Sequence, residues 1–148
     1  MIIMETDVFL ELHVPDFERV IKIYSKLGFK VVWKSEDYLV IRKGKSVLNF
    51  YGGTKRVFNH PYFKKWSGKT KKGYAVEIII PIDGIKQFYK KIKKFVKVVE
   101  PLKFKRWGRW DFRIEDPFGF YIRFTERYDW VNKLDKQQKM LIEKYKKC

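Results

Sequence analysis

The chain has 148 residues and 18.1 kDa, and its 45% hydrophobic and 18% aromatic content suits one folded domain with a sizeable core rather than a disordered chain. It has no apolar run of the roughly 18 residues that a membrane-spanning helix needs, no signal-peptide pattern at its start and one cysteine, Cys148, so we expect a cytoplasmic protein without a membrane partner. A net charge of +17, from 34 Lys and Arg against 17 Asp and Glu, favours anionic ligands and disfavours cationic ones.

The first half of the chain, about residues 7–53, predicts a strand, a helix and three more strands. Apolar residues alternate with others up to Pro15, as in a strand with one buried face. Asp16 can then cap a helix that runs through Leu27 and ends at Gly28. The expected strands are residues 7–14, 30–34, 38–42 and 46–51. This unit has the order β-α-β-β-β.

A basic connector, residues 54–72, follows the first half. Its basic residues are not balanced by any acidic residue, and aromatic residues lie among them. They are Lys55, Arg56, Lys64, Lys65, Lys69, Lys71 and Lys72, with Phe58, Tyr62, Phe63 and Trp66. A surface of this kind can bind single-stranded nucleic acid, because bases stack on aromatic rings. The other interpretation is a solvated linker that a few aromatic side chains anchor to the domain.

The second half, about residues 73–127, repeats the order of the first. Its expected elements are a strand at 76–82, a helix at 85–92, and strands at 96–101, 110–115 and 120–125, with a turn at 116–119. Two copies of one unit should pack together and share a core. After the repeat, residues 128–148 predict an amphipathic C-terminal helix that covers an edge of the domain or a partner surface.

Two short sequence motifs accompany the repeated order. One runs from Val14-Pro15-Asp16-Phe17 to Leu27-Gly28-Phe29, and the other joins Trp107-Gly108-Arg109 to Asp116-Pro117-Phe118-Gly119. Over about residues 7–127 the chain thereby resembles the vicinal-oxygen-chelate superfamily, which includes glyoxalase I, extradiol dioxygenases and bleomycin-resistance proteins. The resemblance implies an α/β (α+β) fold in which two tandem βαβββ modules form a curved mixed sheet around a cavity, with the C-terminal helix added. Residues 1–148 are then one domain, and a homodimer is expected.

The resemblance also indicates where metal-binding members of the superfamily carry their ligands. Those places, in the first and last strands of each half, fall on Phe9, Asn49, Glu77 and Arg123. Phe9 has no donor atom for a cation, and Arg123 has a fixed positive charge and no lone pair. We therefore expect no metal ion and no other cofactor there. Two interpretations of Arg123 stay open: a buried ion pair with Glu77, or a contact for an anionic group of a ligand.

Further polar residues share the strand face of these four positions. They are Glu11 and His13 in the first strand, and Asp111, Arg113 and Tyr121 in the last two strands. Together these residues form the expected ligand-binding set. A displaced metal site of Glu11, His13 and Glu77 is an alternative, although its spacing matches no familiar ligand pattern. Catalysis without a metal, with His13 or Glu77 as a base, also stays open.

Three function classes follow from these observations. The first is a protein that binds a small anionic or aromatic molecule without the usual metal site of the superfamily. The second is a metal-dependent lyase, isomerase or dioxygenase with a displaced ligand set. The third is a nucleic-acid-binding module that uses the basic connector. The sequence ranks the first class highest and leaves open whether the protein is an enzyme, because one superfamily hosts several chemistries.

Overall fold

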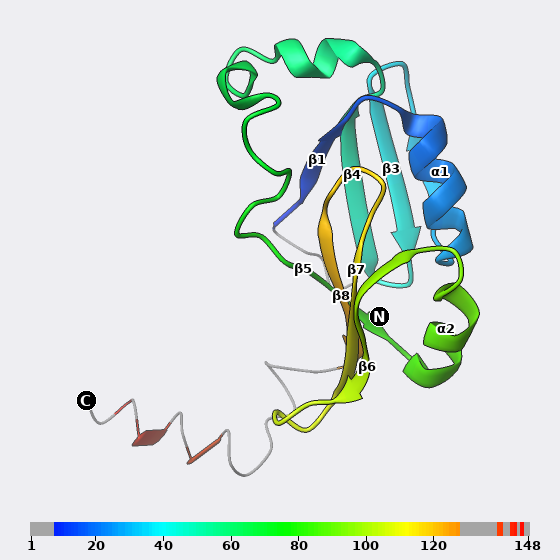
Figure 1. Ribbon diagram of the computed structural model, residues 1–148, viewed down its shortest axis with the longest axis vertical. Coiled ribbons are helices and arrows are strands. Elements are labelled where there is room, and N and C mark those ends of the chain that lie inside the picture. The colour runs from blue at the N-terminus through cyan, green and yellow to red at the C-terminus, as the bar shows by residue number, and fades with distance from the viewer. Residues whose placement is uncertain (1–7, 128–138, 141–142, 145, 147–148) are drawn as a thin grey trace, which may run out of the picture.

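The computed structural model describes residues 8–127, 139–140, 143–144 and 146, and its elements repeat in the two halves of the chain (Figure 1). The first half contains β1 (Glu11–Val14), α1 (Phe17–Lys26), β2 (Lys30–Lys34), β3 (Tyr38–Lys43) and β4 (Ser46–Gly52). The connector contains two short 3₁₀ helices, η1 (Lys55–Asn59) and η2 (Lys64–Trp66). The second half contains β5 (Ile78–Ile82), α2 (Ile85–Ile92), β6 (Lys97–Phe104), β7 (Trp110–Glu115) and β8 (Tyr121–Glu126).

Each half folds into a mixed four-stranded sheet with the same strand order. The orders are β1-β4-β3-β2 and β5-β8-β7-β6, and in each sheet the first pair is parallel and the others are antiparallel. The predicted α+β fold of two tandem βαβββ modules is therefore confirmed. Within the described residues, no helix has the length and apolar composition to cross a membrane. The helix predicted at residues 128–148 lies largely outside the described part of the chain.

Helix α1 begins where the sequence predicts it. The Oδ1 atom of Asp16 accepts a hydrogen bond from the backbone N–H of Arg19 at 3.1 Å, which makes Asp16 the N-cap. Phe17, Val20 and Tyr24 follow at spacings of three and four residues and are all buried. These three side chains hold α1 against one face of the first sheet.

Two strands begin later than the apolar alternation predicts. β1 begins at Glu11, after residues 8–10, and β5 begins at Ile78 instead of Val76. Before β5, Ala75 has a left-handed φ of 63°, and the Val76 N–H donates a hydrogen bond to the carbonyl of residue 73 at 2.9 Å. The chain therefore turns at a place where its side-chain pattern still reads as a strand.

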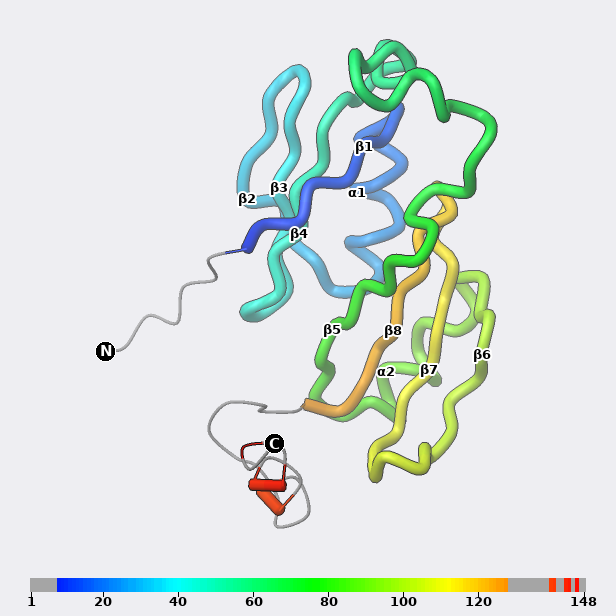
Figure 2. Tube along the Cα trace, turned by 90° about the vertical axis from the view of Figure 1, so that its left-hand side faces the viewer, coloured from blue at the N-terminus to red at the C-terminus, as the bar shows by residue number. Residues whose placement is uncertain are grey.

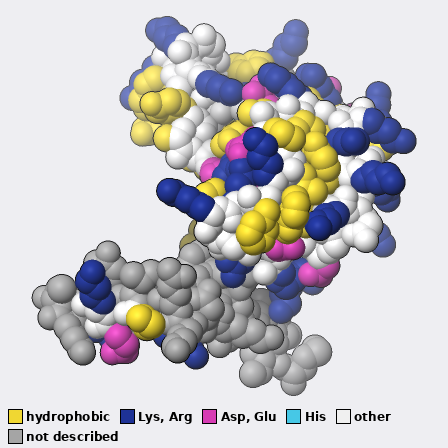
Figure 3. All heavy atoms as spheres, turned by 60° about the horizontal axis from the view of Figure 1, so that its bottom comes forward, with side chains coloured by type: hydrophobic (Ala, Val, Ile, Leu, Met, Phe, Trp, Pro, Cys, Tyr) yellow, Lys and Arg dark blue, Asp and Glu magenta, His cyan; other side chains and the backbone are white. Residues whose placement is uncertain are grey.

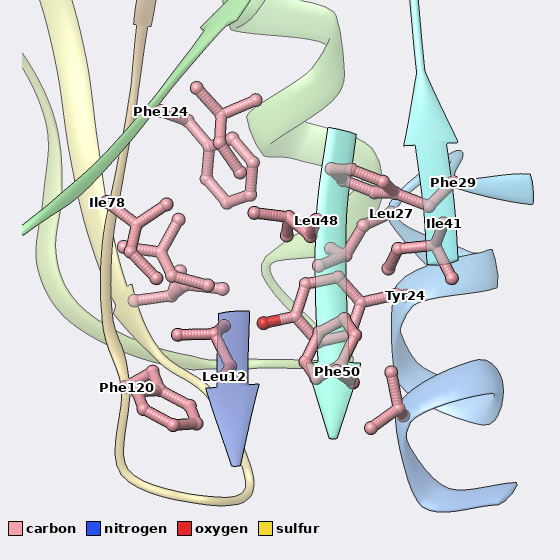
Figure 4. Close-up of a cluster of buried hydrophobic side chains, with 14 of the residues drawn as sticks. Leu12, Tyr24, Leu27, Phe29, Ile41, Leu48, Phe50, Ile78, Phe120 and Phe124 are labelled. Carbon is pink, nitrogen blue, oxygen red and sulfur yellow. The ribbon is translucent and has the colours of Figure 1, made fainter. Parts of the chain in front are cut away.

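The two halves share one hydrophobic core, as the repeat predicts. Leu12 of β1 and Leu48 of β4 lie between Phe124 of the second half and Tyr24 of the first (Figure 4). The Tyr24 hydroxyl donates a hydrogen bond of 2.9 Å to Oδ2 of Asp116, which lies in the turn before β8. In Figure 2 the first sheet lies above the second, and the connector runs from the end of β4 past β1 to β5.

Candidate functional site

The second sheet has one face on the core. The opposite face, named the open face below, carries charged side chains, of which Asp111 and Arg113 are themselves buried. On β7, Phe112 and Ile114 lie in the core, so the alternating residues of this strand lie on the open face. On β8 the same alternation applies, because Ile122 and Phe124 are buried in the core. The predicted site residues on or beside this open face are Glu77, Asp111, Arg113, Tyr121 and Arg123.

An ion-pair network joins the charged members of this set. Arg113 lies at its centre: its Nε is 2.6 Å from Glu77 Oε1, and its Nη1 is 2.9 Å from Glu100 Oε2 and 3.2 Å from Asp111 Oδ1. Arg123 is more distant, with its Nε 3.6 Å from Glu77 Oε1. The expected ion pair between Glu77 and Arg123 is therefore present, but the hydrogen-bond partner of Glu77 is Arg113.

Sequence reasoning missed two members of the network, Glu100 and Lys105. Glu100 is the register partner of Arg113, and Lys105 pairs with Glu100 and lies 3.8 Å from Asp111 Oδ1. Three carboxylates therefore face three cationic groups, and the charges balance. Within this network, as far as the structure describes the chain, two buried atoms have no hydrogen-bond partner: Oδ2 of Asp111 and Nε of Arg123.

The remaining predicted residues lie on the first sheet. Glu11 of β1 is the register partner of Asn49 of β4, and Glu11 Oε1 lies 3.8 Å from His13 Nε2. Phe9 precedes β1 and is 71% exposed. Among residues 8–127, no hydrogen bond or ion pair joins these four residues to the charged network on the second sheet. Within residues 8–127, Glu77 therefore makes no contact of this kind with Glu11 or His13, as a displaced metal site of these three residues would need.

The connector packs against the first sheet through aromatic side chains. The His13 ring lies 4.9 Å from the Tyr51 ring, 5.1 Å from the His60 ring and 5.2 Å from the Phe63 ring, between centroids. These contacts agree with a connector that is anchored by its rings. Trp66, a ring that could stack on a base, has the Lys65 ammonium 4.3 Å from its centroid. Nucleic-acid binding by the connector stays a prediction.

The packing of His13 predicts a pH dependence of stability. Burial lowers the pKa of His13 below its ordinary value of 6.5; the nearby charges of His60 and Lys72 act in the same direction, and Glu11 opposes them. Because the unfolded chain binds a proton more readily than the folded one, His13 contributes stability above pH 6.5 that is lost as the pH falls through its folded pKa. Urea unfolding between pH 7.5 and 5 should therefore show a shallower loss of stability in His13→Gln than in the unaltered chain. Equal slopes would contradict this role.

A pocket of about 690 Å³ lies beside β1, between that strand, the connector and the start of the second half. Glu11 and His13 line it, so two of the predicted site residues face a cavity. The other predicted residues are not among its lining residues. The sequence signal that could have located this pocket is the aromatic content of the connector.

A family model described as the Glyoxalase/Bleomycin resistance protein/Dioxygenase superfamily matches residues 8–124. The chain belongs to this superfamily. The match covers both βαβββ halves and the connector, and stops just short of the end of β8. No curated protein sequence matches the chain.

Solved structures from this superfamily share the fold. A bleomycin resistance determinant encoded on the transposon Tn5 has a TM-score of 0.61 and 17% identity, over 84% of this chain and 100% of that one. A bleomycin-binding protein complexed with bleomycin has a TM-score of 0.59 and 17% identity, over 84% and 100%. A glyoxalase/bleomycin resistance protein/dioxygenase family enzyme from Burkholderia phytofirmans PsJN has a TM-score of 0.65 and 13% identity, over 80% and 95%.

The four residues that the resemblance assigns to metal-ligand positions do not fit a divalent cation. Glu77, the one carboxylate among them, lies between Arg113 and Arg123, whose charges would repel a cation. Phe9 has no donor atom. In the part of the chain that the structure describes, no group of three or more His, Cys, Asp or Glu side chains is placed to hold a metal ion.

Proposed function

We propose that this superfamily member binds a small anionic molecule, planar or aromatic in character, without a metal ion, on the open face of the second sheet. The observation that supports this most is that the Nε of Arg123 is buried without a hydrogen-bond acceptor, because Glu77 accepts its hydrogen bond from Arg113 instead. A guanidinium with an unused N–H is suited to a carboxylate or phosphate group. The net charge of +17 also favours an anionic over a cationic ligand.

The surface around this face supports the same ligand class. Ile79 is the register partner of Arg123 and is 49% exposed, so an exposed apolar residue neighbours Arg123 on the adjacent strand. On the face of the molecule that Figure 3 draws, Lys and Arg side chains outnumber Asp and Glu and lie beside hydrophobic patches, in keeping with the net positive charge. An anionic group on Arg123 and a flat apolar body on Ile79 would use both features.

We also propose that a second copy of the chain encloses this site. Large apolar side chains are exposed on and beside the sheets, including Ile79 of β5 and Phe9 before β1, and a monomer gains from covering such surface. Light scattering should then give twice the chain mass of 18.1 kDa at micromolar concentration. A single-chain mass at that concentration would contradict the enclosure but not the role of Arg123.

Arg123→Met tests the site. Isothermal titration with 1-naphthoate, in buffer that contains EDTA and with Lys72→Met in every chain so that the Lys72 ammonium cannot bind the probe, should show saturable binding that the Arg123 substitution weakens about tenfold or more, because a charge-assisted hydrogen bond is lost. Arg127→Met is the matched control: its ion pair with Asp83 is exposed and lies at the end of β8. Equal affinities of the two variants would contradict the proposed function.

A further inference from the structure

The pocket beside β1 has apolar walls from three parts of the chain. The connector supplies Phe58, Phe63 and Trp66, the first half supplies Leu10 and Leu12, and the second half supplies Val76, Ile78 and Phe120. Its volume of about 690 Å³ lies within the range of about 300–1,000 Å³ that is typical of small-molecule sites. The walls alone would suit an apolar molecule of moderate size.

One cationic group in this pocket is poorly compensated. The Lys72 ammonium donates a hydrogen bond of 2.8 Å to the backbone carbonyl of His13, and it lies 5.7 Å from the Phe58 ring centroid and 5.9 Å from that of Phe120. Among the described residues, no carboxylate lies within 4 Å of it. An ammonium has three N–H donors, so two are left after the bond to His13. Burial lowers the pKa of Lys72, and the more distant charge of Asp116 only partly offsets this.

The neighbouring lysine shows the contrast. Lys71 also lines the pocket, but its ammonium lies 3.0 Å from Glu115 Oε2 and is therefore neutralised by the protein itself. The carbonyl of His13 holds Lys72 in place because β1 is the edge strand of its sheet, which leaves that carbonyl without a strand partner. The fold thus fixes an ammonium against aromatic walls and leaves its charge unmatched.

We propose that this pocket is a second binding site, which takes a hydrophobic monocarboxylate: the carboxylate binds the Lys72 ammonium, and the apolar body packs against Phe58, Phe63 and Trp66. The site lies apart from the Arg123 face and does not depend on it. An ion pair with the ligand would relieve the cost of keeping the ammonium half-buried. The Glu11 carboxylate also lines the pocket, so it repels an anion there and weakens the attraction that Lys72 exerts.

Octanoate and 1-octanol test the inference, because they share a chain length and differ in charge. Calorimetric titration should show that octanoate binds about tenfold or more tightly than 1-octanol. Lys72→Met should remove this preference, and the matched Lys69→Met, an exposed lysine of the same connector that does not line the pocket, should keep it. Equal binding of the two probes to the unaltered chain, or equal effects of the two substitutions, would overturn the inference.

Further variants separate the charge of Lys72 from its hydrogen bond, and the pocket from the Arg123 face. Lys72→Gln keeps a hydrogen-bond donor for the His13 carbonyl but has no charge. It should therefore lose the preference for octanoate over 1-octanol, while an unchanged melting temperature shows that the pocket is intact. Glu11→Gln should tighten octanoate binding about two- to threefold, because one like charge is removed. Arg123→Met should leave octanoate binding unchanged; a loss there would place octanoate on the second sheet and overturn the pocket assignment, whatever the fate of the proposed function.

Discussion

Arg113→Met is expected to lower the free energy of unfolding by about 3–5 kcal/mol, because the substitution removes the central cation of the network and leaves the fully buried Asp111 carboxylate with a single cation, Lys105, 3.8 Å away. The Asp111 side chain is fully buried and lies 3.2 Å from Arg113 Nη1, and Glu77 loses its hydrogen-bond partner at 2.6 Å. In the variant Glu77 keeps Arg123 at 3.6 Å and Asp111 keeps Lys105 at 3.8 Å, and neither contact is a hydrogen bond. Urea unfolding followed by circular dichroism at pH 7 measures the effect.

The control for this substitution is again Arg127→Met. The Arg127 ion pair with Asp83 has the same chemistry and lies at the surface, where solvent screens it. We expect it to leave the unfolding midpoint almost unchanged. Similar losses in both variants would mean that the Arg113 network is solvated, and the role assigned to the second-sheet face would fail.

Asp116→Ala is expected to cost about 3–5 kcal/mol, because each buried donor that loses its acceptor costs about 1–3 kcal/mol. Asp116 Oδ1 accepts hydrogen bonds from the backbone N–H groups of Phe118 and Phe120, and Oδ2 accepts one from the Tyr24 hydroxyl. This carboxylate therefore holds the turn before β8 and joins the two halves. Tyr24→Phe removes only the hydrogen bond between the two halves, so it should lower the free energy of unfolding by less than Asp116→Ala does.

Asp116→Asn is the matched control for the charge of this residue. Burial raises the pKa of Asp116, while the bonds from Phe120, Tyr24 and Phe118 lower it, so the ionised carboxylate is held at a cost. An amide keeps an acceptor for both backbone N–H groups and carries no charge. We therefore expect Asp116→Asn to lower the free energy of unfolding by less than half as much as Asp116→Ala does in the same urea titration. An alanine variant as stable as the asparagine variant would contradict this role of the turn.

Local features of the fold could be predicted because local chemistry decides them. Asp16 caps α1 because its carboxylate, placed directly before the apolar helix pattern, can accept a hydrogen bond from a backbone N–H of the first helical turn. The repeated βαβββ order could be predicted because each sheet buries one face, so that apolar and other residues alternate along its strands. The starts of β1 and β5 could not be placed in the same way, since the left-handed turn at Ala75 leaves the apolar alternation unchanged.

The site could be predicted less completely, because its contacts join distant residues. The alternation of residues along the strands places Asp111, Arg113 and Arg123 on one face. The register of β6 is irregular at Glu100, so the alternation could not predict that Glu100 accepts a hydrogen bond from Arg113. The Tyr24–Asp116 bond spans 92 residues and leaves no sequence pattern. The folding of the connector onto β1 follows from tertiary packing of aromatic rings, so periodicity could not locate the pocket beside β1.

The most direct test of metal-independent binding at Arg123 is a calorimetric titration of 1-naphthoate with the full chain carrying Lys72→Met, which removes the ammonium of the pocket beside β1. The titration is made first with the protein as purified, then after EDTA treatment, and then with Zn²⁺, Ni²⁺ or Mn²⁺ added back. Elemental analysis of the same samples gives the metal content. We predict one affinity in all three states, no stoichiometric metal in the purified protein, and a loss of affinity in Arg123→Met. Binding that disappears with EDTA and returns with one divalent ion per chain would contradict this assignment.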